Sequence, residues 1–182
     1  MTMFSTFVNL TRLTAIFAAG TSLLVAADGV SAKDGMVEVP AALNPNKLSI
    51  FRIVSATGVQ VYTCSRNSAG APGWILKGPD AQLFDSQNKL VGKHYAGPTW
   101  EDLNGGKVVG EVKTSMPAPV DKAVPWLLLD AKSHEGSGAF TQAQAIVRMG
   151  TIGGTTPGDG CGEGRAGQEL RVPYTAVYVF LK

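Results

Sequence analysis

The fold is decided by residues 78–112, which read GPDAQLFDSQNKLVGKHYAGPTWEDLNGGKVVGEV. The polar link at 86–89 separates two β-prone runs, and the pair Asn104 and Gly105 separates two more. Short runs of this kind, joined by turn-forming residues, are typical of β-hairpins, and Asn-Gly readily adopts the positive φ angles of a tight turn. The stretch therefore predicts two hairpins in succession.

The same pattern continues on both sides of this stretch. A hairpin is predicted around Ser55–Gly58. Residues 140–145 predict a single helical turn at most. Further β-prone runs are 48–54, 59–64, 74–77, 126–131, 145–149 and 174–181. Many short strands separated by turns predict an all-β, single-domain sandwich or barrel of mostly antiparallel strands with long loops.

In two of these runs the order of apolar and polar residues predicts which faces of the strand are buried. The continuous apolar run 126–131 predicts a strand that is buried on both faces. In the last run, the period of two places Tyr174, Tyr178 and Phe180 on one face and Val177, Val179 and Leu181 on the other.

The amino terminus has the outline of a secretory signal peptide. Arg12 precedes an apolar stretch that is short for a membrane span, and small residues follow it. We expect cleavage after Ala32, with Ala27 as the second choice, which leaves residues 33–182 as one exported domain, periplasmic or extracellular. An uncleaved anchor or a buried first helix is the alternative.

The two cysteines, Cys64 and Cys161, fit an exported chain. An even cysteine count outside the cytoplasm predicts a disulfide; two free buried thiols or a metal pair are the competing interpretations. Cys161 lies in the glycine-rich segment 150–167, which we expect to be a long irregular loop held by that bond. A loop that closes over a ligand is the functional alternative.

Charge and composition limit the partners. The formal net charge is +2, and the basic residues are scattered rather than clustered, which argues against nucleic acid. No cofactor motif is present, since the glycines of the loop feed no helix. We expect a monomer with no membrane span after signal removal, and a small ligand or polysaccharide as the partner.

Several phrases resemble one family. Residues 58–64, 92–101, 124–129 and 171–176 are similar to the exported domain-of-unknown-function family 3455 of bacteria and fungi. The resemblance implies a single-domain extracytoplasmic protein, and it implies no established activity or catalytic residues. The chain departs from the family where residues 149–152 read Met-Gly-Thr-Ile in place of a more polar phrase.

Five residues are the binding candidates: His94, Tyr95, Trp100, Glu101 and His134. The aromatic residues are mostly expected in the core, but Trp100 follows proline and precedes two carboxylates, which predicts a strand end near solvent. His94 is expected to be half-buried and satisfied by a backbone carbonyl or a carboxylate. The alternative makes it a general base or ligand with Glu101 as the acid partner.

The carboxylates and the nucleophilic side chains do not identify a reaction. Glu101 and Asp102 should point to opposite faces of a strand, which weakens a glycosidase-type pair, and Asp80 after Gly-Pro is expected in a turn. No serine or cysteine nucleophile motif is present. A binding or interaction module is therefore the leading hypothesis for this exported β-domain.

Two alternatives stay open. One is a metal-assisted hydrolase or lyase that uses His94, His134 and a carboxylate such as Glu101, Asp85 or Asp130. The other is a structural, envelope-associated protein.

Overall fold

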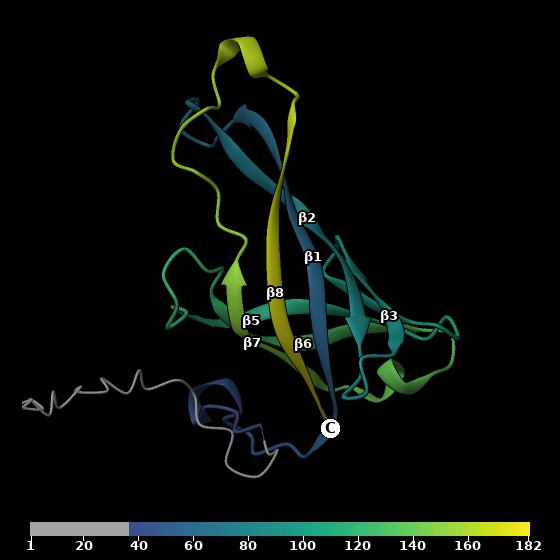
Figure 1. Ribbon diagram of the computed structural model, residues 1–182. Coiled ribbons are helices and arrows are strands. Elements are labelled where there is room, and N and C mark those ends of the chain that lie inside the picture. Colours follow the sequence, from purple (N-terminus) through teal and green to yellow (C-terminus); the bar gives the residue numbers. More distant parts are fainter. Residues whose placement is uncertain (1–36) are drawn as a thin grey trace, which may run out of the picture. The chain divides into compact units, whose positions relative to one another are not determined.

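Eight antiparallel strands close into a barrel in the computed structural model, which describes residues 37–182 (Figure 1). Each strand pairs with its neighbours in the chain, and the first pairs with the last. The strands are β1 (Ile50–Arg66), β2 (Pro72–Phe84), β3 (Leu90–Tyr95), β4 (Thr99–Asp102), β5 (Lys107–Met116), β6 (Trp126–Glu135), β7 (Ala145–Gly153) and β8 (Glu169–Leu181). The all-β prediction is confirmed, and of the two predicted architectures, sandwich and barrel, the protein has the barrel.

Short 3-10 helices complete the described chain: η1 (Ala41–Leu43), η2 (Ala139–Gln142) and η3 (Glu163–Arg165). The helical turn expected at 140–145 is η2 in its first half only, since η2 ends at Gln142 and β7 begins at Ala145. No helix within residues 37–182 has the length and hydrophobicity that a membrane crossing requires. The expected signal peptide, residues 1–32, lies outside the described residues.

The two hairpins predicted within residues 78–112 are confirmed, but the one at Ser55–Gly58 is wrong. β2 pairs with β3 across the 86–89 link and β4 with β5 across Asn104 and Gly105, whereas β1 runs unbroken through Ser55–Gly58. Gly58 has another purpose: a Cβ atom there would lie 2.2 Å from the carbonyl oxygen of Asp80. The glycine permits close packing of β1 against β2 rather than a turn.

Three strands are longer than the expected short ones. β1 has 17 residues, and β2 and β8 have 13 each. Their ends extend past the closed barrel as a three-stranded ribbon, because β3 pairs with β2 only from Asp80 onward and β7 leaves β8 at Tyr174 (Figure 1). The disulfide between Cys64 and Cys161, confirmed here, ties this ribbon to the irregular segment that joins β7 to β8.

The barrel interior is packed with aromatic side chains toward one end. The expected alternation in β8 holds, since Tyr174, Tyr178 and Phe180 all belong to the hydrophobic core. Phe140 of η2 is fully buried and stacks on Phe180, with ring centroids 4.5 Å apart. Stacked and edge-to-face rings add to the free energy gained by burial. η2 therefore closes one end of the barrel.

β6 is buried on both faces only in its middle, so the prediction from its apolar run holds in part, and its last four residues are exposed. Leu129 belongs to the interior core, and Leu128, which points the other way, is only 3% exposed. A pocket on the outer side is lined by Asn44 and Leu48 together with Leu128 and Ala145. The segment after η1 thus covers the outside of β6 beside Leu128, which explains why this side chain is buried although it points away from the barrel interior.

Candidate functional site

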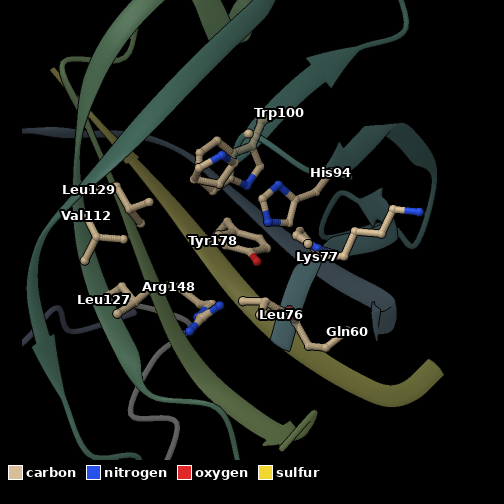
Figure 2. Close-up of a pocket in the computed structure, with 14 residues that line it drawn as sticks. Gln60, Leu76, Lys77, His94, Trp100, Val112, Leu127, Leu129, Arg148 and Tyr178 are labelled. Carbon is tan, nitrogen blue, oxygen red and sulfur yellow. The ribbon is translucent and has the colours of Figure 1, made fainter. Parts of the chain in front are cut away.

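A cavity of about 240 Å³ lies in the barrel near the β3–β4 turn (Figure 2). Every strand contributes at least one residue to its wall. The β3–β4 turn contributes Gly97 and Pro98, whereas η2 contacts Asp102 at the opposite end of β4. The cavity is therefore at the end of the barrel that η2 leaves open.

His94 and Trp100 form the deep wall of this cavity. Their rings stack with centroids 4.4 Å apart and an interplanar angle of 12°, and both contact the Tyr178 ring edge-to-face (Figure 2). This arrangement follows from the register, because His94 on β3 pairs directly with Trp100 on β4. Directly opposite residues share one face of a sheet, so both rings point inward.

The imidazole of His94 is held neutral. Its Nδ1 lies 2.8 Å from the carbonyl oxygen of Thr99, and because a carbonyl can only accept, Nδ1 carries the hydrogen. Burial lowers the pKa of His94 to about 3, opposed by this hydrogen bond and assisted by the charge of Arg148. His94 is 2% exposed, more buried than expected, and its carbonyl partner agrees with the structural interpretation.

Trp100 is not near solvent, so that expectation is wrong. The side chain is 1% exposed and contacts Tyr178 and Phe180 edge-to-face. Gly110 on β5 makes room for it, because a Cβ atom there would lie 2.9 Å from the indole ring. The strand brings Trp100 into the barrel while its carboxylate neighbour faces out.

Tyr95 and Glu101 meet on the outside of the barrel. The Tyr95 hydroxyl donates to Glu101 Oε2 at 2.7 Å, and Lys93 Nζ lies 3.4 Å from the same oxygen. The hydrogen bond from Tyr95 lowers the pKa of Glu101, while burial and that carboxylate raise the pKa of Tyr95 to about 12. Glu101 therefore lies on the opposite side of the sheet from His94 and does not form an acid–base pair with it.

His134 is separated from His94 around the barrel. Pairing runs from His94 to Trp100, then to Val108, then to His134, so three strand spacings, at most about 14 Å, separate the two backbones. The Nε2 of His134 lies 2.8 Å from the carbonyl oxygen of Ala143. Within the described residues, no group of three or more His, Cys, Asp or Glu side chains is placed to hold a metal ion.

The remaining carboxylates have structural partners. Asp80 is a strand residue of β2 that pairs with Arg171, so its assignment to a turn is wrong. Asp102 is buried and accepts the backbone N–H groups of the β4–β5 turn, and Glu101 faces outward, as the alternation of a strand predicted. Asp85 accepts N–H groups of the β2–β3 turn, and Asp130 pairs with Lys113.

Most of the cavity residues were missed as site candidates, among them the polar residues Gln60, Arg148 and Tyr178. Arg148 alternates with Ile146 along β7, and Ile146 is a core residue, so the arginine also points inward. A charged residue in register with core residues was the available signal. It was overlooked because Arg148 was counted only as one of the scattered basic residues.

Comparison with known proteins gives one match. Residues 45–182 match the family described as "Protein of unknown function (DUF3455)". No curated protein and no solved structure matches the chain.

Proposed function

The chain belongs to the DUF3455 family of proteins of unknown function, and we propose that its barrel binds a small, largely apolar ligand in the cavity beside His94 and Trp100. The observation that carries the proposal is that cavity, which all eight strands line at the open end of the barrel. An eight-stranded barrel is just wide enough to hold one small ligand in its interior.

The rim of the cavity supports ligand entry. Leu76 and Val112 line the cavity, and each is 53% exposed. Deeper in, Leu127 and Leu129 continue the apolar wall toward the stacked rings. Exposed apolar side chains at the edge of a concave site are characteristic of ligand-binding clefts, where the ligand completes the burial.

The size of the cavity narrows the class of ligand. A cavity of about 240 Å³ is larger than the ~150 Å³ that suffices for benzene and smaller than most drug-sized sites. It therefore fits one ring or a short chain rather than a peptide or an oligosaccharide. Trp100 is buried in the wall, so it offers no exposed platform for stacking a sugar.

The proposal is tested with small aromatic probes of either charge. Residues 33–182 would be titrated with indole, phenylacetamide and phenylacetate by ligand-observed NMR and calorimetry. Leu76→Trp narrows the mouth and should abolish binding of every probe that binds the wild type. Ile75→Trp is the matched control, because Ile75 is the neighbouring residue on β2, is 42% exposed and does not line the cavity.

Each result has a clear meaning. Saturable binding that Leu76→Trp removes and Ile75→Trp retains supports the proposal. Absence of binding for all three probes, or binding that is equal in both variants, contradicts it.

A further inference from the structure

Arg148 places a positive charge on the cavity wall. It pairs in register with Leu127 of β6 and Tyr178 of β8, both of which also line the cavity. Its Nε donates to the carbonyl oxygen of Pro125 at 3.0 Å. Among residues 37–182 it forms no ion pair, so its charge is not balanced by any described carboxylate.

Two buried donors in the same wall also lack partners. Gln60 and Trp100 are each 1% exposed, and neither Gln60 Nε2 nor Trp100 Nε1 has a hydrogen-bond partner in the described part of the chain. Both residues line the cavity with Arg148. A buried donor without an acceptor costs free energy, so these two groups add to the polar character of the wall that carries the charge of Arg148.

Among the residues that line the cavity, Arg148 is the one charged side chain without a counter-charge. The residues that line it include no Asp or Glu. Lys77 is the only other cationic side chain in the lining, and its Nζ pairs with Glu169. His94 is neutral, with a pKa lowered to about 3 by burial. The site therefore suits a ligand with a single negative charge.

Building on the proposed function, we infer that the ligand is a small apolar monocarboxylate whose carboxylate binds Arg148 while its hydrocarbon body lies against the leucines of the cavity wall. The guanidinium group presents paired donors that match a carboxylate in geometry, and charge-assisted hydrogen bonds are about twice as strong as neutral ones. A phosphate ester would bring a second charge that the wall does not neutralise.

The test compares phenylacetate with phenylacetamide, which has the same size and shape without the charge. By calorimetry at neutral pH, the wild type should bind phenylacetate at least about tenfold more tightly than the amide. Arg148→Gln should remove this preference, and Arg148→Lys should keep part of it. Arg66→Gln is the matched control, because Arg66 is an exposed arginine outside the cavity.

The outcomes separate this inference from the proposed function. If the amide binds as tightly as the acid and Leu76→Trp still blocks both, the barrel binds small ligands but the carboxylate assignment is overturned. If phenyl phosphate binds more tightly than phenylacetate, a phosphate ligand replaces the carboxylate. Should Arg148→Gln fail to fold, Arg148→Met provides a second variant, and an unchanged preference for the acid in it overturns the role of the guanidinium group.

Discussion

Replacing His94 by glutamine should flatten the dependence of stability on pH under mildly acidic conditions. An unfolded chain protonates this imidazole below its ordinary pKa of 6.5, whereas burial lowers the pKa in the folded protein to about 3. Between these two values the unfolded state binds the extra proton, so the free energy of unfolding falls as the pH falls. Glutamine does not titrate, and its amide still offers a donor to the Thr99 carbonyl.

The size of the effect follows from the two pKa values. The linkage relation with 6.5 and about 3 gives a loss of about 2.6 kcal/mol from this one group between pH 7.5 and pH 4.5. That is a large part of the 5–15 kcal/mol by which typical domains are stable. His94→Gln also loses part of the stacking on Trp100, so we expect it to be less stable than the wild type at neutral pH while losing less on acidification.

The assay is urea unfolding of the wild type and variants at both pH values. The quantity compared is the change in unfolding free energy between pH 7.5 and pH 4.5, because carboxylates contribute equally to both proteins and cancel. His134→Gln removes the other histidine and is the matched control for losing an imidazole elsewhere in the barrel. An equal drop in the wild type and His94→Gln would refute the neutral, desolvated imidazole.

The other predictions concern the covalent link, the packing and the cavity charge. Replacing both Cys64 and Cys161 by serine opens a link across 97 residues and should cost about 4–5 kcal/mol in urea unfolding, and a loss under 1 kcal/mol would contradict it. Gly110→Ala forces a Cβ against the Trp100 ring and should cost about 1–3 kcal/mol. In a variant without the other two tryptophans, Trp100 should emit at short wavelength and resist acrylamide; strong quenching would mean an exposed ring. Arg148→Met should melt no lower than the wild type, because it removes an unpaired charge, and a clear loss would assign the arginine a structural role.

The sequence was sufficient for most of the strands and turns because those signals are local. Residues 78–112 contain turn residues at the right spacing, and the period of two in β8 defines its buried face. The failure at Gly58 has a physical cause. A glycine that supplies a turn and a glycine that lets two strands approach look the same in one dimension, and only the pairing of β1 with β2 distinguishes them.

The candidate site was predicted in part. His94 and Trp100 were chosen together and are in fact stacked, because they flank a tight turn and pair directly. Tyr95 and Glu101 were attached to them by proximity in sequence, but the alternation of the strand sends both to the outer surface. Arg148 shares a cavity with His94 and Trp100 only because the sheet closes into a barrel through the pairing of β1 with β8, and that long-range pairing has no local signal.

The polar groups inside the barrel fall into two kinds, and the difference separates scaffold from site. Asp102 and the Nδ1 of His94 are buried, but backbone groups of nearby turns satisfy them, so they help to fix the hairpins that carry them. Gln60 Nε2 and Trp100 Nε1 have no such partner, and Arg148 has no described counter-charge. Folding alone gains nothing from an arginine without a counter-charge on this wall, since leucine or methionine would fill the same space at lower cost. The presence of Arg148 on the cavity wall is accounted for when a ligand supplies the counter-charge, which is why the charge of the probe, rather than its size, is the decisive variable.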